Sequence, residues 1–146
     1  MNIRFIRALK SANFSYNGIG DEGTAAVSDA LKTNSTLETL ELRSNKVGAA
    51  GAQSLAGMLQ VNRVLKSADF SVNDIEDEGA AALSEALKSN STLETLKLRQ
   101  NKIGAAGAQS LAGMLQFNRA LTSLNLARNQ IGAGGAKAIA DSLPQS

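Results

Sequence analysis

The side chains of this sequence that could do chemistry are serines, carboxylates and basic groups, because the chain contains no histidine and no cysteine. The usual general base and the commonest metal ligand are therefore missing. A serine or cysteine catalytic triad cannot be built, and disulfides and thiolate metal sites are excluded. Ser–Lys dyads stay open, but no spacing singles one out. We expect no catalytic residue, no metal site and no cofactor, and hence a chain that is not an enzyme.

Two acidic pairs, Asp21-Glu22 and Asp77-Glu78, occur at equivalent places in the chain. Both stand where helices are expected to begin, and acidic side chains there complement the positive N-terminal end of a helix. Glycine-rich runs follow the same turn in other parts of the chain. None of them continues into the Lys-Ser/Thr of a phosphate-binding loop. These residues therefore indicate helix starts rather than a catalytic or nucleotide site.

Five asparagines recur at a constant interval of 28 residues: Asn17, Asn45, Asn73, Asn101 and Asn129. An asparagine side chain carries both a donor and an acceptor, so that it can satisfy backbone groups of a buried turn on two sides. We interpret the five residues as a structural ladder between stacked units rather than as catalytic groups. A fixed period of this length is typical of a solenoid.

Each unit contains the elements that would position such a ladder. A short run of alternating apolar residues precedes the asparagine and predicts a strand, and apolar residues at helical spacing follow the turn. The joining segments contain Asn34, Asn62, Asn90 and Asn118, where the end of a helix often takes a left-handed residue. Gly57 and Gly113 fall inside expected helices. The sequence does not decide whether the outer face tolerates these two glycines or close packing requires them.

The period predicts one repeat domain from residue 9 to residue 146, with units 9–36, 37–64, 65–92, 93–120 and 121–146. Residues 1–8 are interpreted as a remnant of a preceding repeat. Residues 9–64 align without a gap with residues 65–120 and differ at 13 of 56 positions, so the larger unit is a pair of repeats. Neither end shows the polar cap that solenoids usually need. Either Met1, Ile3, Phe5 and Ile6 cover part of the first repeat, or the ends associate with another copy.

The pattern LxxLxLxxNxIGxxGAxxLAxxL resembles the leucine-rich repeats of the ribonuclease-inhibitor class, and phrases such as NSTLETLKLRQNKIG (residues 90–104) are similar to repeat tracts of NOD-like receptors. The resemblance implies an α/β horseshoe, with a parallel sheet on the concave side and helices on the convex side. Strands lie about 4.8 Å apart and helices roughly 8–10 Å apart, so the stack must curve. The chain departs from the ribonuclease-inhibitor pattern because asparagine fills every turn position, with no alternating cysteine, and the period is uniform.

In that arrangement the outward strand positions form columns on the concave face. Binding sites usually bury aromatic or arginine anchors among polar neighbours. The candidate protein-binding residues on this face are Tyr16, Glu41, Arg43, Asp69, Lys97, Arg99 and Arg128. The alternative is that Glu41 with Arg43, and Asp69 with Lys97, simply pair with each other on the sheet.

The formal net charge of +2 comes from 15 basic and 13 acidic side chains, a balance that argues against nucleic acid and anionic membranes as partners. No apolar run approaches the ~18 residues of a membrane span, and we expect a cytoplasmic protein. The predicted function is a non-enzymatic protein–protein interaction module. One alternative is an engineered or excised repeat block without an independent function. Because GTPase-activating proteins also use this repeat class, the other is a small-GTPase regulator.

Overall fold

The computed structural model describes residues 9–144, in which five strands alternate with five helices. The strands are β1 (Ser11–Asn13), β2 (Thr39–Glu41), β3 (Ser67–Asp69), β4 (Thr95–Lys97) and β5 (Ser123–Asn125). The helices are α1 (Gly20–Thr33), α2 (Ala49–Val61), α3 (Glu76–Leu87), α4 (Ala105–Leu115) and α5 (Gly132–Ser142). The proposed remnant at residues 1–8, with Met1, Ile3, Phe5 and Ile6, lies outside the described residues.

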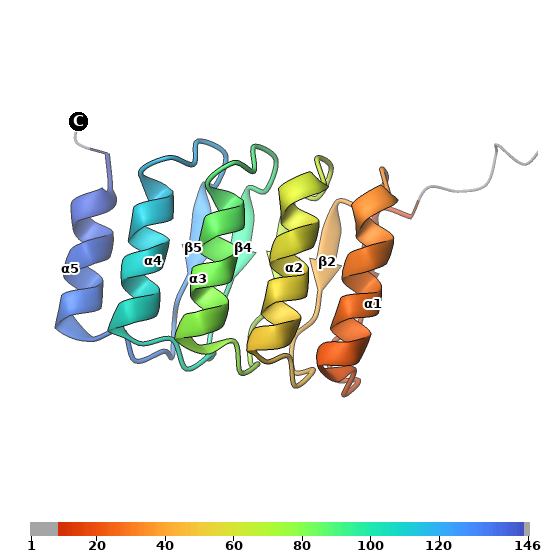
Figure 1. Cartoon of the computed structure of the whole chain (residues 1–146), viewed down its shortest axis with the longest axis horizontal. Coiled ribbons are helices and arrows are strands. Elements are labelled where there is room, and N and C mark those ends of the chain that lie inside the picture. Colours follow the sequence, from red (N-terminus) through yellow and green to blue (C-terminus); the bar gives the residue numbers. More distant parts are fainter. Residues whose placement is uncertain (1–8, 145–146) are drawn as a thin grey trace, which may run out of the picture.

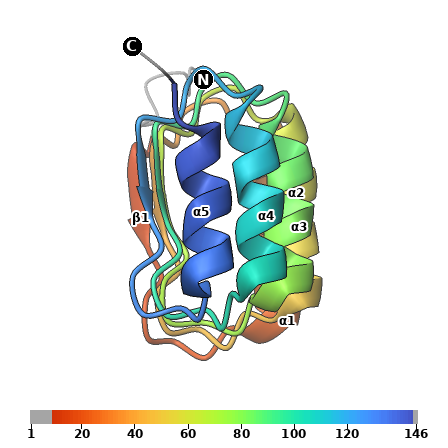
Figure 2. The same ribbon diagram turned by 90° about the vertical axis from the view of Figure 1, so that its left-hand side faces the viewer.

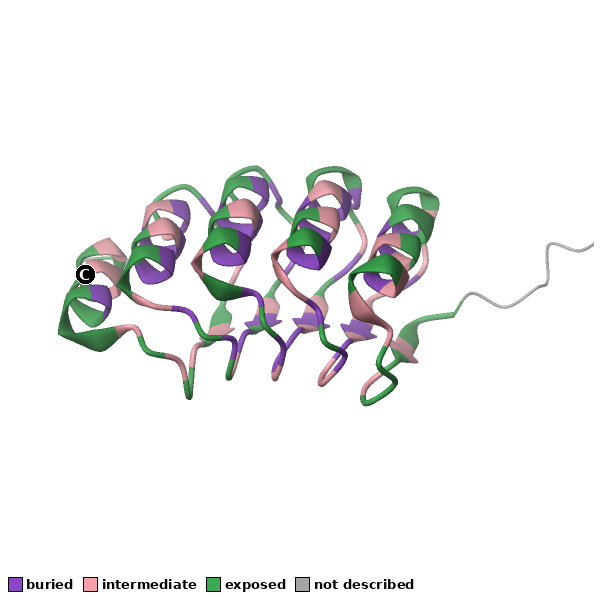
Figure 3. Cartoon of the chain, turned by 60° about the horizontal axis from the view of Figure 1, so that its bottom comes forward, coloured by how far each residue is buried: buried purple, intermediate pink, exposed green. Residues whose placement is uncertain are grey.

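All five strands join one parallel sheet in the order of the sequence, and each pairs with the strand 28 residues away. Parallel neighbours need a long crossover, which the helix of each unit supplies. The helices form a second layer on one side of the sheet (Figures 1 and 2). They fan along the outer side of a shallow arc while the strands follow the inner side (Figure 3). The predicted leucine-rich-repeat solenoid is therefore confirmed.

The core lies between the sheet and the helices and is most complete in the middle repeats. Leu40 and Leu96 from the strands and Leu83 from α3 have no exposed surface. The inward phenylalanines show the contrast with the ends, because Phe70 is fully buried whereas Phe14 in the first repeat is 38% exposed. A repeat therefore completes its burial only when it has neighbours on both sides.

The period-28 asparagines line the turn after each strand and join consecutive repeats. Asn73 shows the full pattern: its Oδ1 accepts the N–H groups of Asn45 and Val47, both at 2.9 Å, and its Nδ2 donates to the Leu42 carbonyl at 3.1 Å. The side chain of each such asparagine thus forms hydrogen bonds with backbone groups of the preceding repeat. Asn17, in the first described repeat, donates only within its own unit, to the carbonyls of Phe14 and Ser15.

A second series of asparagines holds the opposite edge of the solenoid. Asn62, Asn90 and Asn118 each donate to the carbonyl of a leucine 31 residues earlier, at the end of the preceding helix. Their Oδ1 atoms accept N–H groups two and three residues further on. The predicted left-handed conformation is wrong, because no asparagine of this series has a positive φ among the described residues, and Asn34 and Asn62 are extended. These residues satisfy the helix ends through their side chains instead.

The acidic residues explain why the repeats come in pairs. Asp77 lies in the first turn of α3 as expected, but its Oδ1 accepts the N–H groups of Gly104 at 2.7 Å and Gly107 at 3.0 Å, at the start of α4. Asp21 does the same for Gly48 and Gly51 at the start of α2. Because α2 and α4 have no acidic residue in their own first turn, each takes its N-terminal acceptor from the preceding repeat.

Two glycines of α4 have opposite surroundings. A Cβ on Gly107 would lie 2.6 Å from the Ile103 side chain and 2.7 Å from Asp77 Oδ1, so the close approach requires glycine. A Cβ on Gly113 would meet nothing within 4 Å, and one on Gly57 would meet only the Lys32 side chain at 3.9 Å. The outer face therefore tolerates the mid-helix glycines, which the packing does not require.

Candidate functional site: the concave strip

The outward-facing residues of the five strands and of the turns that follow them form four rows across the inner face of the arc, which we call the concave strip. The first row is Ser11, Thr39, Ser67, Thr95 and Ser123, and the second is Asn13, Glu41, Asp69, Lys97 and Asn125. The third row is Ser15, Arg43, Ser71, Arg99 and Ala127, and the fourth is Tyr16, Ser44, Val72, Gln100 and Arg128. Because each strand is only three residues long, the turns contribute half of this surface.

The second row brings three of the predicted charged residues together. Glu41, Asp69 and Lys97 are direct neighbours in the parallel register. Within the described part of the chain, no ion pair involves any of them, so the pairing of Asp69 with Lys97 is not found. Asp69 only accepts the backbone N–H of Ser71, at 2.9 Å. The row therefore presents two acidic groups followed by one basic group, none of them neutralised by an ion pair.

The third row contains two arginines separated by a serine. Arg43, Ser71 and Arg99 occupy consecutive repeats, and the backbone stays paired here because Ser44 donates to the Ser71 carbonyl at 3.1 Å and Val72 to the Arg99 carbonyl at 2.8 Å. The Nε atoms of both arginines are buried without a hydrogen-bond partner. The expected pairing of Glu41 with Arg43 is also absent between residues 9 and 144. A buried donor without a partner costs free energy, and the rest of each half-buried guanidinium is left for an external acceptor.

The fourth row is shaped by the backbone, because all five of its residues have a positive φ between 56° and 63°. The left-handed turn directly precedes the ladder asparagine, and so lets that side chain point into the stack. Tyr16 and Arg128 lie at the two ends of this row, in the first and fifth repeats, and the structure does not bring them together. Tyr16 is 69% exposed, which makes it an isolated aromatic group at one end of the strip.

A hollow of about 340 Å³ borders the strip where the turns lead into the helices. Its lining includes Lys46, Asp74 and Lys102, which follow the ladder asparagines by one residue and which the sequence interpretation did not single out. Lys102 Nζ lies 2.9 Å from Asp74 Oδ1, and this hydrogen bond and charge raise the pKa of Lys102 above its ordinary value of 10.5. This border of the strip therefore carries a solvent-exposed ion pair between Lys102 and Asp74.

Two other kinds of feature, a metal-binding cluster and a membrane-spanning helix, are absent from the described residues. No group of three or more His, Cys, Asp or Glu residues could hold a metal ion within residues 9–144. No helix in the same range is long and apolar enough to cross a membrane. The arrangement of the concave strip is suited to contact with a polar macromolecular surface.

The family described as "Leucine Rich repeat" matches the chain five times, at residues 9–28, 33–56, 61–84, 89–112 and 117–140. A comparison with curated protein sequences finds no match. Among solved structures, "Leiomodin-1 Actin-Binding Site 2 (ABS2)" is similar with a TM-score of 0.81 and 24% identity, covering 92% of this chain and 78% of that chain. The tropomodulin C-terminal domain of Caenorhabditis elegans is similar with a TM-score of 0.78 and 13% identity, covering 92% of this chain and 82% of that chain. At these identities the similarity is one of fold.

Proposed function

The chain belongs to the leucine-rich repeat family, and we propose that it is a non-enzymatic protein-interaction module whose partner docks on the concave strip. The observation that carries this proposal is that the charged side chains of the strip form no ion pairs within the described residues. The ion pairs of residues 9–144 all lie outside the strip's rows, whereas Glu41, Arg43, Asp69, Lys97 and Arg99 have none. Charged groups arranged without internal partners can select a partner with complementary charges.

The distribution of charge suggests how the partner would be oriented. The acidic groups of the strip, Glu41 and Asp69, lie in the second and third repeats, where Arg43 is also found, whereas the fourth and fifth carry only basic groups, at Lys97, Arg99 and Arg128. A partner with basic side chains opposite Glu41 and Asp69 and acidic side chains opposite Arg43 and the fourth and fifth repeats would complement this distribution. Arg43 and Arg99 are the central anchors because both are half-buried arginines whose side chains form no ion pair within residues 9–144.

Actin is the first partner to test, because one of the structures with this fold is named as an actin-binding site. We would measure cosedimentation with actin filaments, and in parallel capture partners from a cell extract. Arg99→Glu should weaken binding at least tenfold with unchanged helical circular dichroism. Lys137→Glu, the same charge change on α5 and outside the strip, should leave binding unchanged. Binding that survives both Arg99→Glu and Arg43→Glu would contradict the concave strip as the docking surface.

We also propose a second copy of the chain as a partner at an end of the solenoid. An apolar hollow of about 270 Å³ on the fifth repeat, lined by residues that include Leu124, Leu126 and Ile139, supports this. The first repeat exposes Leu9 by 61%. Light scattering over a range of concentrations should then show a dimer that Leu126→Glu disrupts, and a constant monomer mass would refute the idea. The likeness to NOD-like receptor repeats and the cytoplasmic location remain predictions.

A further inference from the structure

A second hollow, of about 510 Å³, lies on the edge of the solenoid where helices end and the next strands begin. We call it the basic hollow, and its lining is Arg63, Val64, Lys66, Ser91, Thr92, Glu94, Arg119 and Ala120. It spans the joining segments before β3, β4 and β5, and none of its residues belongs to the concave strip. Three cationic side chains and one carboxylate give it a net positive charge.

The two arginines of the basic hollow are held in place by their own helix ends. Arg63 Nη1 donates to the carbonyls of Asn62 at 3.0 Å and Leu59 at 3.4 Å. Arg119 Nη1 donates to the carbonyls of Gln116 at 3.1 Å and Asn118 at 3.5 Å. One nitrogen of each guanidinium is thereby fixed, and the remaining N–H groups have no acceptor in the described chain. The site is therefore preorganised for an oxyanion, because its fixed arginines retain unused donors.

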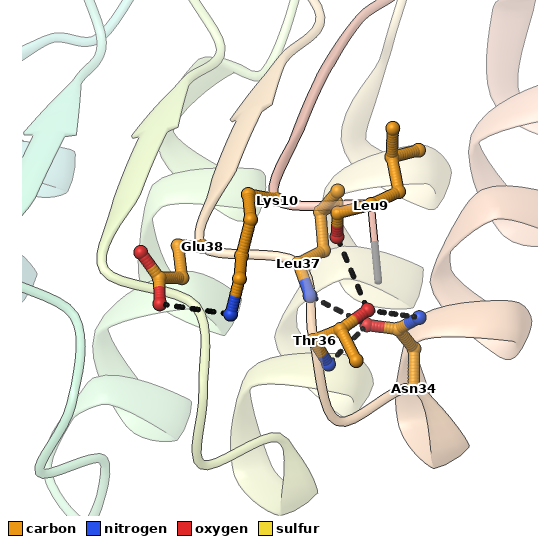
Figure 4. Close-up of polar contacts among 6 residues, drawn as sticks. All are labelled: Leu9, Lys10, Asn34, Thr36, Leu37 and Glu38. Carbon is orange, nitrogen blue, oxygen red and sulfur yellow. Dashed lines mark hydrogen bonds and ion pairs between the residues drawn. The ribbon is translucent and has the colours of Figure 1, made fainter. Parts of the chain in front are cut away.

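The internal duplication supplies a comparison, because the described part of the same edge, with Lys10, Thr36 and Glu38, occurs 56 residues earlier (Figure 4). There, Thr36 Oγ1 donates to the Leu9 carbonyl at 3.1 Å, and Lys10 Nζ lies 3.7 Å from Glu38. At the basic hollow the equivalent Lys66 and Glu94 form no ion pair within the described residues. The equivalent hydroxyl, Thr92 Oγ1, is buried without a hydrogen-bond partner. Groups that satisfy one another in the earlier copy are thus left free in the later one.

The asparagines of this edge explain part of the difference. Asn34 Nδ2 donates to Thr36 Oγ1 at 3.3 Å in the earlier copy (Figure 4). In the later copy Asn90 Nδ2 instead donates to the Leu59 carbonyl at 2.9 Å and the Asn62 carbonyl at 3.5 Å, both at the end of α2, the helix of the preceding repeat. Thr92 loses that contact and gains none. A buried hydroxyl without a partner in the wall of a cationic hollow indicates a place for an external acceptor.

We propose that the basic hollow binds a phosphate group of a phosphorylated serine or threonine in a protein partner. This proposal rests on the proposed function, because it names one chemical feature of the same partner. Arg63, Lys66 and Arg119 line the hollow with cationic donors, and Thr92 adds its hydroxyl once a side-chain rotation brings the buried Oγ1 to the wall. A phosphate offers three acceptor oxygens and up to two negative charges, and so uses more of these donors than a planar carboxylate with one charge. The phosphate docks at the edge while the rest of the partner lies on the concave strip.

The test uses the whole chain and inorganic phosphate as the first probe, followed by ¹⁵N–¹H NMR of the arginine Nε–H and backbone signals. Phosphate should shift the signals of Arg63, Thr92 and Arg119, and an equal concentration of acetate should bind at least tenfold more weakly. A short Gly/Ser peptide with one phosphoserine should shift the same signals. Its glutamate counterpart should bind at least tenfold more weakly.

Matched variants separate the site from general surface charge. Arg63→Gln with Arg119→Gln should weaken phosphate binding at least tenfold, whereas Arg43→Gln with Arg99→Gln on the concave strip should not change it. Thr92→Val should weaken it several-fold, and Thr36→Val in the earlier copy should have no effect. Shifts spread evenly over all arginines, or equal binding of acetate, would overturn a phosphate site. Binding of free phosphate without the phosphopeptide would overturn the docking role, and neither result bears on partner binding at Arg99.

Discussion

The asparagine ladder gives the sharpest test of how this solenoid is held together, through Asn73→Ala. The change removes the acceptor of two buried backbone N–H groups, those of Asn45 and Val47, each at 2.9 Å. It also removes donation to the carbonyls of Leu42 at 3.1 Å and Phe70 at 2.9 Å. A buried polar group left unsatisfied costs about 1–3 kcal/mol. The two N–H groups alone therefore predict a loss of roughly 2–6 kcal/mol in the free energy of unfolding.

Asn17→Ala is the matched control, because within residues 9–144 this side chain, at the same repeat position, donates only to its own repeat. Its side-chain bonds, to the carbonyls of Phe14 and Ser15, are exposed to water. Water can replace the lost donor, so the expected loss is below about 1 kcal/mol. For a chain near this size each kcal/mol shifts Tm by about 2–4 °C, so Asn73→Ala should melt well below Asn17→Ala.

Urea unfolding followed by circular dichroism would measure the free energies, and amide hydrogen exchange would locate the effect. The N–H groups of Asn45 and Val47 should exchange much faster in Asn73→Ala and at an unchanged rate in Asn17→Ala. Equal losses of stability in the two variants would refute the reasoning. So would unchanged exchange at Asn45 and Val47, because it would mean that these groups do not depend on the asparagine oxygen.

Two further predictions concern α4. Gly113→Ala should raise the free energy of unfolding by roughly 0.5–1 kcal/mol, because a methyl there meets nothing within 4 Å, whereas Gly107→Ala should lower it because its Cβ would lie 2.7 Å from Asp77 Oδ1. Thermal melts of both variants check this pair of predictions, and a lower free energy of unfolding for Gly113→Ala would contradict it. Asp77→Ala should lower the free energy of unfolding by about 0.5–2 kcal/mol. It should loosen the first turn of α4 rather than that of α3, as measured by hydrogen exchange at Gly104 and Gly107. Faster exchange confined to α3 would show that the carboxylate caps its own helix instead.

The sequence predicted which residues share the concave strip, but it did not predict whether their charged side chains form ion pairs. The sequence places Glu41, Arg43, Asp69, Lys97 and Arg99 on one face, and the register of the strands agrees. Whether these charges pair depends on side-chain directions that the spacing of residues does not specify. Only the structure shows them without ion pairs within residues 9–144. The hollow lined by Lys46 and Lys102 was not predictable from the sequence either, because its shape depends on the left-handed turn at each ladder asparagine.

The sequence by itself determined the architecture, because an exact period repeats the same local choices of strand, turn and helix, and stacked copies of one unit have few other ways to bury their apolar residues. It also located the asparagines of the turns, since a buried turn needs a side chain with both donor and acceptor. Only the tertiary structure decided with which repeat each polar side chain forms its hydrogen bonds. Asp77 caps the helix of the next repeat and Asn73 serves the turn of the previous one. Such contacts join residues about 28 positions apart, and their direction is set by how the repeats stack rather than by the residues within one unit.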